Sequence, residues 1–255
     1  MPNHSKPGLP WITAAALLSM SYSAFTAQNT CTATSGPAVT PVIELYTSEG
    51  CSSCPPADKW VSSLKGSGMV VQAFHVSYWD YIGWIDRFAA PAYTKRQHEV
   101  AARNKLSGVY TPQAVLNGKD LPAWGPRPPG GKEPARAGIV LTQLGANQFE
   151  ATVTPSAALQ APSWSAYWTV TEHGHSSKVR AGENAGEFLK HDFVVRQYTQ
   201  AGDYQSAGAS PQKLGFYSIA ATPGHERQIN LVVFEPQTGK TLQAVSLQCA
   251  DSFKP

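Results

Sequence analysis

The first half of the chain alternates between short apolar runs and a segment with helical spacing. The run 41–46 (Pro-Val-Ile-Glu-Leu-Tyr) predicts a short buried strand, which ends at the turn 47–50. After the turn, apolar side chains repeat with the period of a helix, at Ala57, Trp60, Val61 and Leu64. A second apolar run, 69–76, predicts another strand. A strand, a helix and a strand in this order form a right-handed parallel crossover.

Two more elements are predicted before this pattern breaks. Pro91 opens a helix that ends near Asn104, since proline is favoured in the first turn of a helix. Residues 113–116 predict a strand that enters a hairpin at the turn pair 117–118, Asn-Gly. Between residues 121 and 134 the chain holds five prolines and three glycines, a density that neither a helix nor a central strand tolerates. We therefore predict a linker over 121–136.

From residue 137 the pattern changes to alternating segments rich in β-branched and aromatic residues, with no helical spacing between them. Glycine and proline turn signals separate the segments. The predicted strands are 139–144, 148–153, 165–172, 193–198, 214–221 and 228–234. This pattern predicts an antiparallel, sandwich-like module over 137–252, preceded by an α/β domain over 38–120.

The beginning of the chain predicts export. Lys6 precedes the apolar run Trp11–Met20, and small residues follow it, an order typical of a secretory signal peptide over 1–27. Ser21 and Ser23 suit one cleavage position, and a cut after Ala27 is the other. The apolar run is too short to cross roughly 30 Å of hydrocarbon, so we expect no permanent membrane anchor. A periplasmic or secreted protein is predicted.

Composition excludes one class of partner. Hydrophobic residues make up 42% of the chain and charged residues 15%, which is enough apolar material for a buried core. The formal net charge is +3, and the Lys and Arg residues form no dense block. A nucleic-acid binder needs such a basic patch, so we expect no nucleic-acid partner.

Export places the four cysteines in an oxidising compartment, where disulfides are the expected state. Cys51 and Cys54 are close enough to pair locally, which leaves Cys31 to pair with Cys249. Such a bridge would close a loop of roughly 200 residues and act structurally, with a chain-entropy contribution on the order of 5 kcal/mol. The alternative is that Cys31 stays free or pairs between chains.

The Cys51-Ser52-Ser53-Cys54 motif lies between the first predicted strand and the helix, which is the context that thiol-disulfide exchange requires. A helix start lowers the pKa of a thiol, so Cys51 is the candidate nucleophile. Cys54 lies one turn deeper and is the candidate resolving thiol, which attacks a mixed disulfide on Cys51. Ser52 and Ser53 offer hydroxyl donors to the thiolate, or serve only as helix-start residues. The alternative for the pair is an inert structural disulfide.

The segment 42–58 (Val-Ile-Glu-Leu-Tyr-Thr-Ser-Glu-Gly-Cys-Ser-Ser-Cys-Pro-Pro-Ala-Asp) resembles the opening of a bacterial family of secreted, uncharacterised proteins with a thioredoxin-like domain. Residues 75–84 (His-Val-Ser-Tyr-Trp-Asp-Tyr-Ile-Gly-Trp), 110–113 (Tyr-Thr-Pro-Gln) and 117–118 resemble the other motifs of this domain-of-unknown-function family, in the same order. The resemblance is strong over residues 40–120 and weak beyond them. It implies an α/β thioredoxin-like domain, here followed by the β-rich, sandwich-like domain, and it implies no particular substrate.

The resemblance also implies roles for single residues. Pro112 matches the cis-proline that thioredoxin-like proteins place opposite the cysteines, and the backbone of Thr111 before it would pair with a substrate chain. Glu44, on the first strand, is a candidate to relay a proton to Cys54, as a buried acid does in thioredoxins. The chain departs from the pattern after the hairpin, where proline-rich residues replace the expected closing helix. Either the β-rich region or a partner then covers that face of the sheet.

The segment after the second strand offers candidates for a substrate groove. Tyr78, Trp79 and Asp80 combine aromatic surface with polar tips, and His75 and Trp84 flank them. For any one of these aromatics the alternative is simple burial in the core.

We expect an exported thiol-disulfide oxidoreductase without a cofactor. Its substrates would be exported thiol or disulfide proteins or small thiols, served by a redox partner that the sequence does not identify. One alternative is a copper or zinc carrier that uses the same cysteines with a nearby histidine. In the segment 172–175 (Glu-His-Gly-His), a second metal site competes with an ordinary hairpin tip. Another alternative is a non-catalytic binding module in which the Cys51–Cys54 disulfide is structural.

Overall fold

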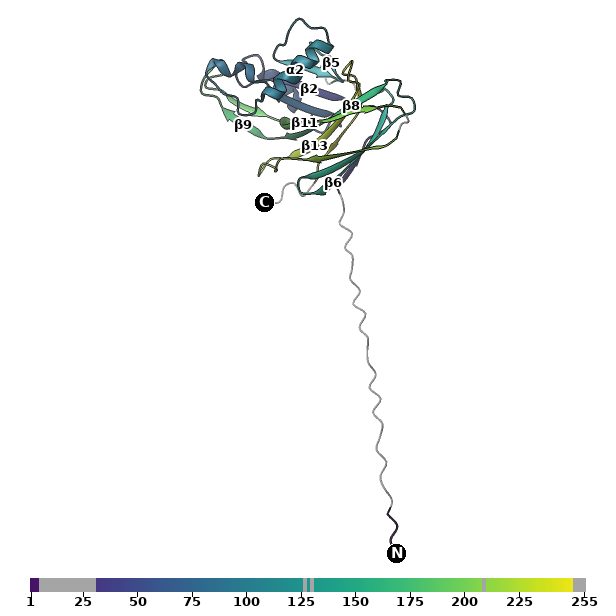
Figure 1. Ribbon diagram of the computed structural model, residues 1–255. Coiled ribbons are helices and arrows are strands. Elements are labelled where there is room, and N and C mark those ends of the chain that lie inside the picture. Colours follow the sequence, from purple (N-terminus) through teal and green to yellow (C-terminus); the bar gives the residue numbers. More distant parts are fainter. Residues whose placement is uncertain (5–30, 126–127, 129–130, 208–209, 250–255) are drawn as a thin grey trace.

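A computed structural model describes residues 1–4, 31–125, 128, 131–207 and 210–249. The predicted signal peptide, apart from its first four residues, lies outside the described residues. Two β-sheets form most of the described chain, with α1 (Pro55–Ser62) and α2 (Pro91–Arg103) near one end of it (Figure 1). A short 3₁₀ helix, η1 (Ser77–Ile82), lies between the second parallel strand and α2 in the chain.

The larger sheet has eight strands in the order β14-β13-β8-β11-β3-β2-β4-β5. Strand β2 pairs in parallel with β3, and β3 also pairs in parallel with β11. The remaining neighbours in this sheet are antiparallel. The strand bounds are β2 Val42–Thr47, β3 Val70–His75, β4 Gln113–Leu116, β5 Lys119–Asp120, β8 Ser163–Glu172, β11 Val194–Gln205, β13 Arg227–Phe234 and β14 Thr241–Leu247.

The two helices cover opposite faces of the parallel strands, because side chains alternate between the faces of a strand. Ile43 and Leu45 pack with the apolar side of α1, in a cluster that includes Trp60. Tyr46, on the other face, packs with residues of α2 such as Tyr93. The odd-numbered residues of β2 therefore face α1, and the even-numbered residues face α2.

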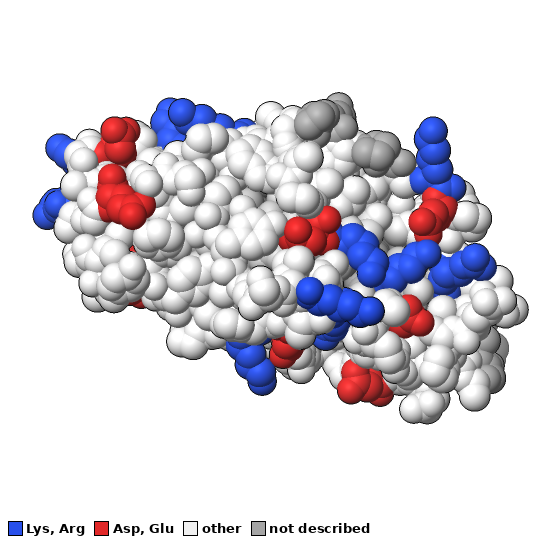
Figure 2. All heavy atoms as spheres, turned by 90° about the horizontal axis from the view of Figure 1, so that it is seen from above, with Lys and Arg blue, Asp and Glu red and all other residues white. Residues whose placement is uncertain are grey.

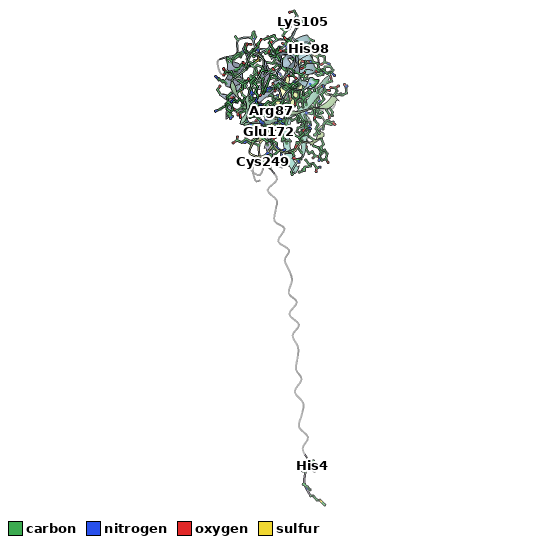
Figure 3. The ribbon with its side chains drawn as sticks, turned by 90° about the vertical axis from the view of Figure 1, so that its left-hand side faces the viewer. His4, Arg87, His98, Lys105, Glu172 and Cys249 are labelled. Atoms are coloured by element: carbon green, nitrogen blue, oxygen red, sulfur yellow. A yellow bond between two sulfur atoms is a disulfide. The ribbon has the colours of Figure 1, made fainter. Side chains whose placement is uncertain are left out.

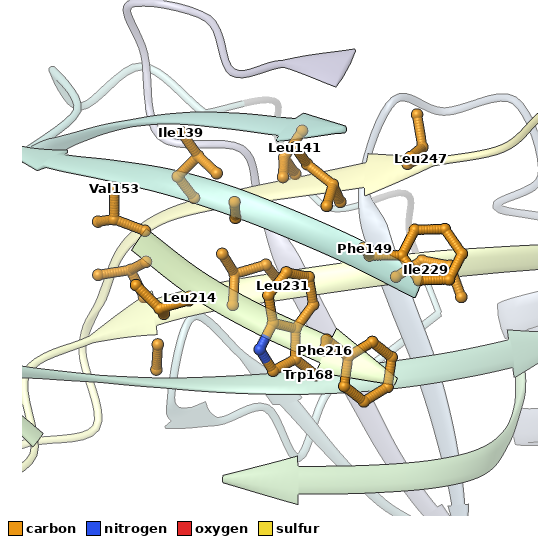
Figure 4. Packing of buried hydrophobic residues seen from close by; sticks show 14 of the residues in the cluster. Ile139, Leu141, Phe149, Val153, Trp168, Leu214, Phe216, Ile229, Leu231 and Leu247 are labelled. Carbon is orange, nitrogen blue, oxygen red and sulfur yellow. The ribbon is translucent and has the colours of Figure 1, made fainter. Parts of the chain in front are cut away.

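A four-stranded antiparallel sheet, in the order β1-β6-β7-β12, packs against the part of the larger sheet formed by β8, β13 and β14. Its strands are β1 Thr32–Thr34, β6 Ala137–Gly145, β7 Gln148–Pro155 and β12 Gln212–Tyr217. Figure 4 shows the core between the sheets, where Leu141 and Phe149 of the smaller sheet meet Trp168 and Leu231 of the larger. The ring of Trp168 stacks on Phe216, with 5.0 Å between their centroids.

The larger sheet is continuous across the predicted boundary between the two domains, since β11 of the second half pairs directly with β3 of the first. The division into two domains stays a prediction from the sequence. Where the closing helix of the first domain was expected, Leu121 and Trp124 pack against the α1 cluster, as does Phe193. The ring centroids of Trp124 and Trp60 are 5.6 Å apart. Residues of this chain therefore cover part of that face.

A two-stranded hairpin extends from the second half of the chain toward α1. It consists of β9 (His175–Lys178), β10 (Phe188–His191) and the loop between them, and we call residues 175–191 the β9–β10 arm. Leu189 and His191 are buried, whereas Phe188 and Lys190 are exposed. The alternation shows that one face of β10 packs against the protein and the other faces solvent.

The structure pairs Cys31 with Cys249, as the sequence predicts, across a sequence separation of 218 residues. Cys249 belongs to the core between the two sheets, and Cys31 packs against that core. Figure 3 places Cys249 at the end of the molecule opposite Lys105 and His98. This disulfide therefore fastens the residue before β1 to the segment that follows β14, far from α2.

One face of the molecule, seen in Figure 2, is mostly uncharged, and acidic and basic side chains lie next to one another on it. Within the described residues, no helix combines the length and hydropathy needed to cross a membrane.

Candidate functional site

The Cys51–Cys54 disulfide lies where β2 passes into α1. Cys54 is the N-cap residue of α1, and its backbone N–H donates to the Cys51 carbonyl at 3.2 Å. The turn before it is fixed locally, because the Gly50 N–H donates to Ser48 Oγ at 3.1 Å and the Cys51 N–H to the Ser48 carbonyl at 3.2 Å. The Cα atoms of Cys51 and Cys54 are 5.4 Å apart, and both cysteines are fully buried.

The 3₁₀ helix η1 covers the disulfide turn from one side. A Cβ atom on Gly50 would lie 3.0 Å from Trp79 Cβ and 3.2 Å from Ile82 Cδ1, so a larger residue there would require these side chains to shift by a few tenths of an ångström. Gly182 of the β9–β10 arm has φ +76°, and a Cβ atom there would lie 2.9 Å from the same Ile82 atom. Ile82 therefore packs where η1, the cysteine turn and the arm meet.

The β9–β10 arm covers the disulfide from the other side. The buried Asn184 side chain donates to the carbonyls of Glu49 and Cys51, at 2.9 and 3.0 Å. Glu183 Oε2 accepts from the Ser52 N–H at 3.0 Å and from Ser52 Oγ at 2.7 Å. Side chains of the arm thus hold the backbone at Glu49, Cys51 and Ser52 by hydrogen bonds, beside the fully buried Cys51.

The structure also brings the predicted Thr111-Pro112 segment to the cysteine pair. The Thr111–Pro112 peptide bond is cis. Ser53 Oγ lies 3.5 Å from the Thr111 carbonyl and 3.3 Å from Cys51 Sγ. Trp79 Nε1 donates to Thr111 Oγ1 at 2.8 Å. Thr111 and Trp79, both predicted to contact a substrate, and Ser53, predicted as a hydroxyl donor to the thiolate, thus form one connected group beside Cys51.

Tyr78 and Asp80 were also predicted at the groove. Tyr78 packs against the apolar cluster on the α2 side of the sheet, and burial raises the pKa of its hydroxyl, although the neighbouring Gln97 and Thr111 offset part of that rise. Asp80 Oδ1 accepts from the Asp86 N–H at 3.2 Å, which ties η1 to the loop before α2. The contacts of both residues position η1.

Glu44 lies on the face of the sheet opposite to Cys54, so the structure does not bring these two residues together. Its carboxylate accepts from Arg96 Nε at 2.9 Å and from Arg96 Nη2 at 2.6 Å, and Arg96 belongs to α2. The hydroxyls of Tyr46 and Tyr167 donate to it as well, at 2.6 and 3.0 Å. Strand alternation is the reason, because an even-numbered residue of β2 points away from α1.

A different group of ionisable side chains lies on the cysteine side of the sheet. We call it the acid–histidine cluster: Glu49, Asp58, His75, Asp86 and His191, all at most 5% exposed. His75 Nδ1 lies 2.6 Å from Asp86 Oδ2, which also accepts from the Glu49 N–H at 2.9 Å. His191 Nε2 lies 3.2 Å from Glu49 Oε1, and its Nδ1 lies 3.8 Å from Asp58 Oδ2.

Burial and neighbouring groups together shift the pKa values of the carboxyl groups of this cluster in different directions. Burial raises the pKa of Asp58, and the nearby His191 and His75 offset only part of that rise. Burial also disfavours the charged form of Asp86, but His75 beside it holds the pKa of that carboxyl below its ordinary value. For Glu49, the nearby His191 ring, together with Ser177 and Trp84, outweighs burial and lowers the pKa. Asp58 is thus the carboxyl in the cluster that holds a proton most readily.

Several polar atoms of the cluster lack a hydrogen-bond partner among the described residues. They are Glu49 Oε1, His75 Nε2 and both ring nitrogens of His191, so the contacts of His191 are ion-pair contacts without hydrogen-bond geometry. Buried polar atoms are almost always paired, and exceptions gather at functional sites. Sequence analysis did not find this cluster, although Glu49, Asp58 and His75 lie within the motifs that it quoted.

A groove of about 690 Å³ opens between α1 and the β9–β10 arm, next to the disulfide. Ser52 and Pro55 line it on the cysteine side, and Asn184 and Leu189 line it on the arm side. Asp58 also lines the groove, so it connects the acid–histidine cluster to solvent.

The segment 172–175 forms the connection between β8 and β9. His175 Nε2 lies 2.9 Å from Glu172 Oε2, which also accepts from Thr222 Oγ1 at 2.8 Å. Figure 3 shows Glu172 between Arg87 and Cys249. The described residues contain no group of three His, Cys, Asp or Glu side chains arranged to hold a metal ion.

The comparisons with known proteins identify relatives but no activity. Two solved structures resemble this one. Protein AGR_C_4864 from Agrobacterium tumefaciens is 20% identical, with a TM-score of 0.63, and the match covers 84% of this chain and 96% of that one. HBP35 of Porphyromonas gingivalis is 13% identical, with a TM-score of 0.58, and the match covers 87% of this chain and 78% of that one. At these identities the likeness concerns the fold alone. No curated protein matches the sequence. The model of a family described as "Protein of unknown function (DUF1223)" matches residues 42–234, and the chain belongs to that family.

Proposed function

We propose that this protein is an exported thiol-disulfide oxidoreductase with a thioredoxin-like first half, acting through Cys51 and Cys54. The observation that carries the proposal is the position of the disulfide at the N-terminus of α1, where Glu49 and Asp58 of the buried acid–histidine cluster flank the cysteine pair in the sequence. A helix N-terminus favours a thiolate, and nearby acid and base groups supply and remove its protons. Cys51 is the nucleophile, and Cys54 is the resolving thiol.

The arrangement of secondary structure supports the thioredoxin-like assignment. Strands β2 and β3 are parallel and joined through α1, α2 covers the opposite face, and the antiparallel hairpin β4–β5 continues the sheet. The cysteine pair follows the first of these strands, and the Thr111-Pro112 segment lies beside it. This is the order of parts that the resemblance implies.

The surroundings of the disulfide favour exchange over a purely structural role. A bridge that only braces the fold needs no charged neighbours, and buried carboxyls and imidazoles cost free energy unless they are well paired. Glu49, Asp58 and Asp86 are nevertheless buried here beside His75 and His191, with several polar atoms unpaired in the described residues. Such groups concentrate at functional sites.

The compartment follows from the cysteines. Two disulfides in one chain are typical of proteins exposed to an oxidising environment. We propose export to the periplasm or beyond, with exported proteins or small thiols as substrates.

Trapping a mixed disulfide tests this function. In the Cys54→Ser variant, Cys51 attacks a disulfide substrate and no resolving thiol releases it, so a stable adduct with glutathione or a model peptide should accumulate. The Cys51→Ser variant should form far less adduct. Equal adduct in the two variants, or none in either after reduction of the protein, would refute the proposal.

A further inference from the structure

The carboxylate of Glu183 lies at the start of α1, on donors directly beside Cys51. Its Oε2 accepts from the Ser52 hydroxyl at 2.7 Å and from the Ser52 N–H at 3.0 Å, and Ser52 follows Cys51 in the chain. These two hydrogen bonds lower the pKa of the Glu183 carboxyl, so it is charged at neutral pH. Both residues are exposed, so their contact adds little to the stability of the fold. What matters for the chemistry is the position of the negative charge.

A Cys51 thiolate needs the donors that Glu183 occupies. A thiolate at a helix start is stabilised by N–H groups that have no partner and by the positive end of the helix dipole. The N–H of Cys54 donates to the Cys51 carbonyl at 3.2 Å, and both donors of Ser52 point to Glu183. The Ser53 hydroxyl lies 3.3 Å from Cys51 Sγ and can donate to it. Glu183 therefore leaves Cys51 fewer donors, and its charge repels a thiolate.

The β9–β10 arm fixes this charge in place. On one side of Glu183, the buried Asn184 side chain donates to two backbone carbonyls of the cysteine turn, at 2.9 and 3.0 Å. On the other side, Gly182 approaches Ile82 so closely that a Cβ atom on the glycine would lie 2.9 Å from Ile82 Cδ1. The backbone of Glu183 is thus held from both sides. Its carboxylate reaches Ser52 because the arm is docked on the cysteine turn.

We propose that Glu183 is a positioning residue that acts through Ser52: while the arm is docked, its carboxylate withholds two donors from Cys51 and reduces the share of Cys51 present as thiolate. The inference rests on the proposed function and deepens it, because it gives the arm control over the redox equilibrium of the cysteine pair. A dithiol whose reduced form is stabilised is a stronger oxidant as a disulfide. The docked arm therefore makes the Cys51–Cys54 pair a weaker oxidant, and an arm lifted by a substrate makes it a stronger one.

The equilibrium with glutathione shows where the charge acts. Two glutathione thiols are oxidised to one glutathione disulfide, and their two electrons break the Cys51–Cys54 bond. The two sulfurs of the protein take up the two protons that the glutathione thiols release, and a Cys51 thiol that ionises returns one of them to water. Glu183 disfavours this ionisation. Removal of its charge should therefore shift the equilibrium toward the reduced protein and glutathione disulfide.

Titration of the reduced full chain, followed by thiolate absorbance, measures the ionisation of Cys51 directly. The Cys54→Ser background leaves Cys51 as the thiol that titrates, since Cys31 and Cys249 remain paired. At low salt, Glu183→Gln should raise the acid ionisation constant of Cys51 about two- to fivefold, the range for one charge near a helix terminus. With Cys54 present, the equilibrium constant for reduction by glutathione should rise by up to the same factor, which is at most about 20 mV in reduction potential.

The controls separate the charge from the contact. Glutamine keeps the length of the side chain and an oxygen that accepts from Ser52, so Glu183→Gln removes the charge and leaves an acceptor in place. Glu187→Gln removes another exposed carboxylate of the same arm and should leave both constants unchanged. The effect of Glu183→Gln should vanish at about 1 M salt, where the screening length falls to about 3 Å. An arm that docks less firmly in the variant would instead change the constants at every salt concentration.

The outcomes distinguish this proposal from the proposed function. Equal ionisation constants in Glu183→Gln and its parent at low salt, or a difference that persists at about 1 M salt, would overturn the role of Glu183 and leave the oxidoreductase proposal intact. A Cys51–Cys54 disulfide that glutathione buffers fail to reduce would overturn the proposed function and the role of Glu183 together.

Discussion

Replacing Glu44 by Gln tests whether this carboxyl serves the fold or the cysteines. The Glu44 carboxylate is buried and accepts four hydrogen bonds, two from Arg96 and one each from Tyr46 and Tyr167. The Arg96 guanidinium also lies 4.0 Å from the centroid of the Tyr167 ring. Burial alone would raise the pKa of Glu44, but Arg96 and the hydrogen bonds lower it below its ordinary value, so the carboxyl is ionised at neutral pH.

The expected loss in the free energy of unfolding follows from the Arg96 charge that remains buried. Gln has nearly the same shape as Glu, so the substitution leaves the Arg96 guanidinium buried without its counter-charge. Breaking a buried ion pair from one side costs about 3–5 kcal/mol. Urea unfolding at pH 7 should show this loss in Glu44→Gln. The double variant Glu44→Gln/Arg96→Met should lose less than the sum of the two single variants, because their effects couple.

The same variant gives a kinetic result. Because Glu44 faces α2 and the cysteines face α1, the rate of disulfide exchange in Glu44→Gln should match that of the wild type under conditions where both are folded. A stability loss below about 1 kcal/mol would contradict the ion-pair account. A tenfold slower exchange with unchanged stability would restore Glu44 as the proton relay.

Three further changes have defined outcomes. Replacing Cys31 and Cys249 by Ser should lower the free energy of unfolding by about 2–5 kcal/mol, as measured by urea unfolding. A redox titration should show an unchanged reduction potential for the Cys51–Cys54 pair. An altered reduction potential would show that the two disulfides are coupled. Asn184→Ala should speed the reduction of Cys51–Cys54 by dithiothreitol severalfold, because it removes two hydrogen bonds that hold the arm over Cys51. Glu187→Gln, at an exposed position of the arm, should not change the rate. Equal rates in the wild type and both variants would mean that the arm does not limit access to the disulfide. Hydrogen bonds from His175 and Thr222 outweigh burial and lower the pKa of Glu172 to about 2, so its contribution to stability is full above pH 4.5 and is lost as the pH falls toward 2. Glu172→Gln should therefore be less stable than the wild type at pH 6 and should show a shallower loss of stability on acidification, and parallel stability curves would contradict this assignment.

The elements with strong periodic patterns were predictable from the sequence. The strands at 42–47 and 70–75 and the helix at 91–103 lie within a residue or two of their predicted limits. Strands β9 and β10 were missed because the segments 175–178 (His-Ser-Ser-Lys) and 188–191 (Phe-Leu-Lys-His) are short and mostly polar. They form a hairpin because alternate residues are buried toward the rest of the protein, which the sequence alone does not reveal.

In the candidate site, too, some residues were predictable from the sequence and others were not. The cysteine pair and the Thr111-Pro112 segment were found because short motifs mark them. The acid–histidine cluster was not found, because its residues come from distant segments of the chain, and His191 joins the others only when the arm packs on α1. The predicted placement of Glu44 near Cys54 overlooked strand alternation. Since Leu45 faces the helix that follows the cysteines, Glu44 has to face the other way.

The measurement that tests the central claim most directly is a redox titration of the native protein that follows both disulfides at once. The protein is equilibrated with glutathione or dithiothreitol buffers of graded potential, free thiols are alkylated, and each pair is read by mass spectrometry. We predict that Cys51–Cys54 titrates reversibly within the range of known exchangers, roughly −120 to −270 mV, while Cys31–Cys249 stays oxidised until potentials below about −300 mV. If Cys51–Cys54 resists reduction as strongly as Cys31–Cys249, or yields only when the protein unfolds, it is a structural bridge and the proposed activity is refuted.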